Sequence, residues 1–125
     1  MINSKKIAFI SPSDGIKSNI VINYLIKSKM IQVNNVTFFT DNYYHFLMNH
    51  PKLINIIEVS DKSLKKNIEL FKQQQYDFII SCGWQKKIDT EIICLSNIAS
   101  INCHSSLLPD YKGGSAYYHY WANCE

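Results

Sequence analysis

Short apolar runs recur along the chain and are separated by stretches with helical spacing of apolar residues. Runs rich in β-branched, aromatic and other apolar residues predict strands. Five such runs cover residues 6–11, 36–40, 53–59, 78–82 and 98–103. Runs of this kind without polar alternation are typical of strands buried on both faces of a sheet.

The intervening segments predict helices. Ile16, Ile20 and Tyr24 recur every four residues, with Val21 and Leu25 beside them, so we expect a helix with one apolar face. The other predicted helices cover residues 43–49, 61–74 and 89–94. Regular alternation of strand and helix predicts an α/β fold, a Rossmann-like three-layer sandwich with a mostly parallel sheet. Neither a repeat nor a linker interrupts it, so residues 1–125 are expected to form one domain.

Composition narrows the class of protein. Apolar residues make up 46% and charged residues 18% of the chain, as in globular proteins. No apolar run has the ~18 residues of a membrane span, and no signal-peptide core is present, which favours a cytoplasmic protein without a membrane partner. The net charge of +3 comes from thirteen scattered lysines without arginine, which disfavours a nucleic-acid partner. The four cysteines form no C-x-x-C pair, so we expect no metal site.

The segment after the fifth predicted strand carries the clearest candidate chemistry. Asn102 and His104 are two positions apart at a strand end, so their side chains are expected on the same side of the sheet. Asn102 offers an amide donor and His104 an imidazole that titrates near neutral pH. Ligands of parallel sheets bind outside the carboxyl ends of the strands, so residues 11–19, 82–88 and 102–114 are the candidate site segments.

The same segment resembles the signature N-x-H-x-S-L-L-P-x-[YFW]-[RK]-G of formyltransferases that use 10-formyltetrahydrofolate. This family includes glycinamide ribonucleotide transformylases, methionyl-tRNA formyltransferases, sugar N-formyltransferases and a related deformylase. Every fixed position of the signature is present, at Asn102, His104, Ser106, Leu107, Leu108, Pro109, Tyr111, Lys112 and Gly113. Residues 76–88 also resemble the family's fourth strand and following loop, so the resemblance is strongest over 76–114 and extends in outline to residues 1–125, the family's amino-terminal catalytic domain in part.

The resemblance implies roles for individual residues. Asn102 and His104 would be catalytic, with Asn102 donating to the tetrahedral oxyanion and His104 moving protons. The co-substrate would be 10-formyltetrahydrofolate. The loop after the fourth strand would hold it, through Trp84, Gln85, Lys86 and Ile88, together with Leu107. An ordinary solvated loop is the other interpretation of residues 83–88.

The family also needs an aspartate, in a Gly-Asp setting, a few dozen residues after the histidine. The acids that follow His104 are Asp110, which lies within the signature, and Glu125. We therefore expect the sheet to be incomplete at its carboxyl-terminal side and the 125-residue chain alone to be inactive. An unpaired sheet edge favours self-association, so a homo-oligomer is also expected.

The acceptor is the least defined part of the function. Asp14 lies in the first loop, and its negative charge would repel a phosphate bound at that loop. This disfavours glycinamide ribonucleotide as the acceptor. A small-molecule primary amine, with a nucleotide-linked amino sugar as first choice, is the expected acceptor. The alternatives are a methionyl-tRNA formyltransferase, a formyltetrahydrofolate hydrolase and a catalytically inactive fragment.

Overall fold

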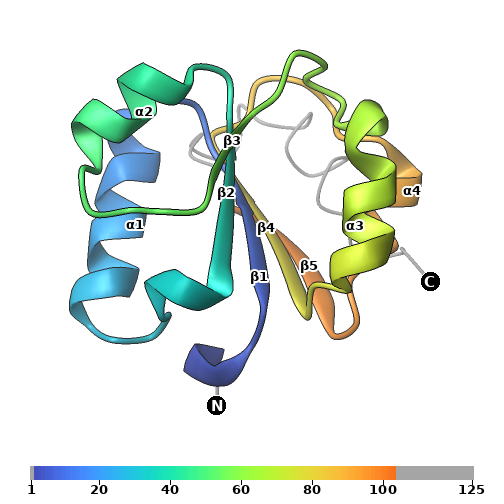
Figure 1. The fold of residues 1–125 in the computed structure, drawn as a ribbon, viewed down its shortest axis with the longest axis horizontal. Helices are drawn as coiled ribbons and strands as arrows, with labels where there is room; N and C mark the ends of the chain where they lie inside the picture. The colour runs from blue at the N-terminus through green and yellow to red at the C-terminus, as the bar shows by residue number, and fades with distance from the viewer. Residues whose placement is uncertain (1, 104–125) are drawn as a thin grey trace, which may run out of the picture.

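The computed structural model describes residues 2–103. They contain a sheet of five parallel strands in the order β3-β2-β1-β4-β5. The strands are β1 (Ile7–Ile10), β2 (Val36–Thr40), β3 (Ile56–Glu58), β4 (Phe78–Cys82) and β5 (Ala99–Cys103). All five lie within the predicted runs. Figure 1 shows the sheet nearly edge-on, with a helical layer on either side. This confirms the expected Rossmann-like α/β architecture.

Strand β1 lies at the centre of the sheet. Its Ile7 pairs with Val36 of β2 on one side and with Phe78 of β4 on the other. The chain therefore winds from β1 through β2 to β3, and then returns to β4 and β5 on the opposite side of β1. All four residues of β1 are buried, because its neighbours cover both edges and helices cover both faces.

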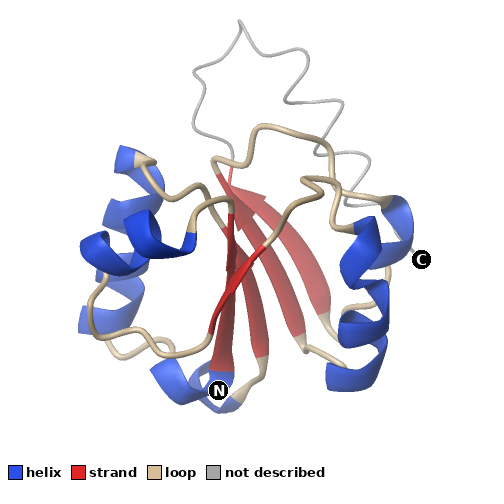
Figure 2. Ribbon diagram, turned by 45° about the horizontal axis from the view of Figure 1, so that its top comes forward, coloured by secondary structure: helices blue, strands red, loops and turns tan. Residues whose placement is uncertain are grey.

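Helices cover both faces of the sheet, as Figure 2 shows. Helices α1 (Ile16–Lys27) and α2 (Tyr43–Asn49) lie on one face. Helices α3 (Ile68–Gln74) and α4 (Thr90–Ile93) lie on the other. Within residues 2–103, short 3₁₀ helices occupy Ile2–Ser4, Val33–Asn35 and Lys65–Asn67. Among residues 2–103, no helix combines the length and apolar character needed to cross a bilayer.

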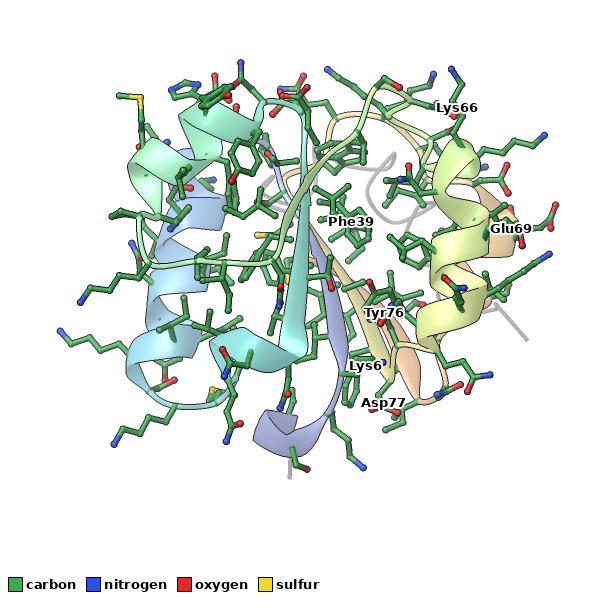
Figure 3. All side chains as sticks on the ribbon, viewed as in Figure 1. Lys6, Phe39, Lys66, Glu69, Tyr76 and Asp77 are labelled. Carbon is green, nitrogen blue, oxygen red and sulfur yellow. The ribbon has the colours of Figure 1, made fainter. Side chains whose placement is uncertain are left out.

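Aromatic side chains fill both halves of the core. On the α3 side, the rings of Phe39 and Phe71 stack at 4.9 Å, and Tyr76 packs edge-on against both (Figure 3). On the α1 side, Phe38 lies between Phe9 and Phe46. Such rings combine a large buried area with specific packing geometry, so they fix how each helical layer sits on the sheet.

The predicted apolar face of the first helix is wrong at Ile16, Ile20 and Tyr24, whereas Val21 and Leu25 beside it pack partly against the core. The side chains of Ile16, Ile20 and Tyr24 are 77%, 62% and 64% exposed. The core instead receives Ile22, fully buried, together with the partly buried Leu25. Helix α1 carries apolar residues around most of its circumference, so their spacing alone does not determine the buried face. Packing against the sheet determines it.

The predicted helix at 61–74 begins later than expected. The Asp61 carboxylate accepts hydrogen bonds from the backbone N–H and hydroxyl of Ser63, which form a turn. Leu64 then adopts a left-handed conformation, with φ of 66°, while its side chain is fully buried. A side-chain-capped turn competes with helix at this point, so α3 begins only at Ile68.

We expect His50 to make the stability of the fold depend on pH. His50 is 4% exposed, packs on Phe46 and has Nε2 2.8 Å from Asn19 Oδ1. Burial lowers the pKa of His50 below its ordinary value of 6.5. The unfolded chain therefore binds the proton more readily than the folded chain, and stability falls as pH drops through that ordinary value.

Urea unfolding at about pH 7.5 and about pH 5.5 measures this loss. The His50→Gln variant should lose part of the pH dependence. The His45→Gln variant, at an exposed position on helix α2, which ends just before His50, should retain it. An unchanged pH dependence in His50→Gln would contradict the assignment.

Candidate active site at the carboxyl ends of the strands

Loops from four strands surround a small hollow outside the carboxyl ends of the sheet. Its volume is about 150 Å³. It is lined by Pro12 after β1, Asp41 after β2, Lys62 after β3, Trp84 and Gln85 after β4, and Asp14. Because the winding reverses between β1 and β4, this is where an open parallel sheet binds ligands. Drug-sized ligands occupy about 300–1,000 Å³, so these residues could enclose only part of such a molecule.

The β1 loop is held in place by the β2 end. The backbone N–H of Ser13 donates to Asp41 Oδ1 at 2.8 Å, and Asn49 Nδ2 donates to the Ser13 carbonyl at 2.8 Å. Burial opposes ionisation of Asp41, but the hydrogen bonds from Ser13 outweigh it and lower the pKa of this carboxyl. Asp41 is therefore a fixed negative charge beside the hollow, with Lys62 as a nearby cation.

The loop after β4 begins with a sharp turn. Gly83 has a φ of 71°, and a β-carbon at this position would lie 3.7 Å from the Pro12 ring. The turn thus brings the loops after β1 and β4 together. Further along, the indole N–H of Trp84 donates to the carbonyl of Lys62 at 2.7 Å, which ties this loop to the segment after β3.

The predicted co-substrate residues of this loop divide into two groups. Trp84 is 8% exposed and Ile88 is fully buried, and both belong to the core beneath α3 and α4. Their side chains anchor the loop to the core and expose little surface to a ligand. Gln85 and Lys86 are exposed, and Gln85 lines the hollow. Whether these four residues bind a folate stays a prediction, and Leu107 lies outside the described residues.

Asn102 lies near the end of β5, directly beside Ser81 of β4 in the strand register. The buried Ser81 hydroxyl donates to Asn102 Oδ1 at 3.1 Å. Since the amide oxygen accepts this bond, the amide nitrogen points away from Ser81. Sequence reasoning missed Ser81, although a serine within the apolar run FIISC was the available signal. His104 lies outside the described residues, so its predicted position beside Asn102 stays a prediction.

Strand alternation decides which face receives Asn102. Cys82 and Cys103 pack with the core on the α1 side, so Ser81 and Asn102 project toward the α3 and α4 side. Ser100, two residues before Asn102, confirms this, because its hydroxyl donates to the Ile93 carbonyl of α4. Asn102 therefore shares its side of the sheet with Trp84.

A larger cavity, of about 580 Å³, lies at the opposite, amino-terminal ends of the strands. Its lining includes Lys6, Tyr76 and Asp77, which Figure 3 labels. The Lys6 ammonium donates to Gln74, and its backbone N–H donates to Asp77 Oδ2 at 3.0 Å, so these charges are engaged in local structure. No predicted site residue lines this cavity. Size alone therefore does not make it the candidate active site.

Within the described part of the chain, no group of three or more His, Cys, Asp or Glu side chains is arranged to hold a metal ion.

Comparison with known proteins identifies the family. A family model described as formyl transferase matches residues 5–125. The chain belongs to the formyl transferase family. It is 38% identical over 69 residues to a methionyl-tRNA formyltransferase of Mesoplasma florum, a match that covers 55% of this chain and 20% of the relative. Over 41 residues, 33% of the chain, it is 46% identical to the enzyme so named from Mycoplasma mycoides, and this match covers 13% of that relative.

A Staphylococcus aureus methionyl-tRNA formyltransferase is 32% identical over 50 residues, 40% of this chain and 16% of that protein. The matches thus span a fifth or less of the relatives' length. Their names contradict the prediction that a nucleic-acid partner is disfavoured, and they favour the tRNA alternative over the amino-sugar acceptor. The charge argument failed because a scattered lysine distribution excludes only a dense phosphate-binding stripe. It does not test recognition of an amino acid attached to tRNA.

We expect Gly83→Ala to destabilise the fold by about 1–2 kcal/mol, because a side chain is strained at positive φ. Gly83→Asn is the matched control, since asparagine tolerates the left-handed conformation better. Urea unfolding of both variants measures the difference. Equal losses of unfolding free energy in the two variants would contradict this reason. They would show that a side chain lacks room at position 83, and not that the backbone conformation requires glycine.

The Ser81–Asn102 hydrogen bond should appear as a coupling in unfolding free energy. Ser81→Ala and Asn102→Ala, alone and combined, form a double-mutant cycle with an expected coupling of roughly 0.5–1.5 kcal/mol. The matched pair Ser81→Ala and Asn23→Ala, with Asn23 exposed on α1, should be additive. Additivity at Ser81 and Asn102 would mean that the bond contributes nothing in solution.

Proposed function

We propose that this chain is part of an enzyme that transfers the formyl group of 10-formyltetrahydrofolate to the amino group of methionyl-tRNA. The observation that carries the proposal is the name shared by the relatives, methionyl-tRNA formyltransferase, at 32–46% identity in the matched segments. The family match over residues 5–125 supports formyl transfer itself. We further propose that residues 1–125 belong to the amino-terminal catalytic domain of the enzyme.

In this proposal Asn102 binds the developing oxyanion. Attack of the amine on the formyl carbon places negative charge on the formyl oxygen, and an amide N–H aimed at that oxygen stabilises it. Ser81 is a positioning residue: its hydroxyl holds Oδ1, which directs the Asn102 nitrogen away from β4. The half-buried setting of Asn102 strengthens the interaction by reducing competition from water.

His104 is proposed to move the proton that the attacking amine loses. An imidazole titrates near neutral pH and is suited to this step. The resemblance also calls for an aspartate later in the chain than the signature, which would orient the imidazole. We propose that turnover depends on that aspartate, since replacing the aspartate that fixes the tautomer of the catalytic histidine costs about 10⁴ in rate in serine proteases.

The loop 83–88 is proposed to hold the folate. Trp84 and Ile88 fix the loop to the core, and the hydrogen bond from Trp84 to the Lys62 carbonyl ties the loop to the segment after β3. Backbone groups of such an anchored loop are preorganised to meet the flat edge of a pterin ring. The exposed Gln85 and Lys86 offer the polar side chains. Leu107 is proposed to add an apolar contact.

The acidic side of the hollow constrains the acceptor. Asp14 and Asp41 lie on the β1 and β2 side, and the lowered pKa of Asp41 keeps it charged. Phosphates placed there would be repelled. We therefore propose that the phosphates of the tRNA lie away from these two carboxylates, while the uncharged methionyl group and its amine approach Asn102.

The decisive experiment measures formylation of methionyl-tRNA by a chimera. This chain would replace the matching part of the Mesoplasma florum relative, and 10-formyltetrahydrofolate would be the donor. Asn102→Ala should lower kcat by about 10²–10³, the usual cost of one oxyanion donor. Ser81→Ala should cost less, because it disturbs only the orientation of Asn102.

Asn23→Ala, at an exposed position on α1, is the matched control and should keep full activity. Full activity of Asn102→Ala would remove the proposed oxyanion role. Formylation of amino-sugar nucleotides but not of methionyl-tRNA would overturn the proposed acceptor. Release of formate without any acceptor would identify a hydrolase instead.

A further inference from the structure

Two free thiols lie side by side at the carboxyl ends of β4 and β5. Cys82 and Cys103 are direct partners in the parallel register, one residue after the Ser81–Asn102 pair. Cys82 is 3% exposed and Cys103 is half-buried. Both face the α1 side of the sheet, so they lie on the face opposite to Asn102. The proposed formyl transfer uses neither of them.

The two thiols differ in reactivity because one donates a hydrogen bond to the other. The bond from Cys82 lowers the pKa of Cys103 to about 7, although burial opposes this change. The same bond, followed by burial, raises the pKa of Cys82. Cys103 is therefore the member of the pair that ionises more readily, close to neutral pH. Thiolates, and not thiols, react with electrophiles and peroxides.

The strand spacing brings the pair close to disulfide geometry. Neighbouring strands lie about 4.7–4.9 Å apart, within the roughly 4.4–6.8 Å between α-carbons of disulfides. The β-carbons of a disulfide lie about 3.5–4.5 Å apart, so they must approach slightly. This movement is feasible because Cys103 is the last residue of β5, which pairs only with β4 within residues 2–103.

We propose that Cys103 is a peroxide-reactive thiol and that Cys82 resolves its oxidised form into a disulfide between β4 and β5. The site is a modification site distinct from formyl transfer, placed on the strand that carries Asn102.

The chemistry balances with hydrogen peroxide as the oxidant. The Cys103 thiolate attacks one peroxide oxygen, the O–O bond breaks, and hydroxide leaves and takes up a proton to form water. Cys103 is then a sulfenic acid. The Cys82 sulfur attacks the Cys103 sulfur, the S–O bond breaks, and the hydroxyl leaves as water with the Cys82 proton. Two thiols and one peroxide thus give one disulfide and two waters.

Mass spectrometry of the peroxide-treated chain tests the proposal. The chain is reduced, freed of reductant, treated with hydrogen peroxide, alkylated and cleaved after lysine. We expect the fragment 73–86, which contains Cys82, to be joined to the fragment 88–112, with the loss of two hydrogen atoms. Because the second fragment also contains Cys94, the Cys94→Ser variant must keep the link, and Cys103→Ser must lose it.

The Cys82→Ser variant separates the two steps. It should stop at the Cys103 sulfenic acid, which a 1,3-diketone probe traps. Unfolded chain in urea should form much less of the link than folded chain, since the register no longer pairs the residues. A link that survives in Cys103→Ser, a link of equal yield in urea, or Cys103 left as thiol in folded chain after peroxide treatment would each overturn the proposal. Circular dichroism of each variant confirms that the comparison is between folded chains.

Discussion

Burial of β1 on both edges and both faces is the constraint on which the other elements depend. Its four apolar residues pair with β2 and β4, and no polar side chain could occupy this position without losing its hydrogen-bond partners. At its carboxyl end, β1 leads directly into the loop that contains Pro12. Because β4 lies beside β1 in parallel, its own exit at Gly83 meets that loop. The candidate site is a consequence of this pairing.

The ends of β4 and β5 present two different chemistries on opposite faces. Ser81 and Asn102 form a polar pair toward α3 and α4, and Cys82 and Cys103 form a thiol pair toward α1. A period of two along each strand and direct register between the strands together create both pairs. The two pairs are mechanically linked, since any movement of the β5 end shifts Asn102 and Cys103 together.

For the acceptor substrate, the charge distribution of the chain and the names of its relatives lead to different conclusions. Scattered lysines without arginine describe the average surface of the chain, and they argue against broad phosphate contacts. The relatives are nevertheless named for an aminoacyl-tRNA. An enzyme that modifies an amino acid needs to place one amine beside one carbonyl carbon, and a hollow lined by Asp14 and Asp41 is compatible with that task when the phosphates lie elsewhere.

Local pattern was sufficient for the strands. Continuous apolar runs such as FIISC favour a strand buried on both faces, and the signature begins at Asn102, within the last of these runs. Tertiary structure decided the rest. Helix α1 has more than one apolar stripe, and packing against the sheet buries Ile22 and leaves Ile20 exposed. Ser81 and Cys82 have partners only through the register with β5. The indole of Trp84 is held by the Lys62 carbonyl, which is 22 residues away in the sequence. Each of these outcomes depends on residues distant in sequence, and no local period encodes which distant residue will be the neighbour.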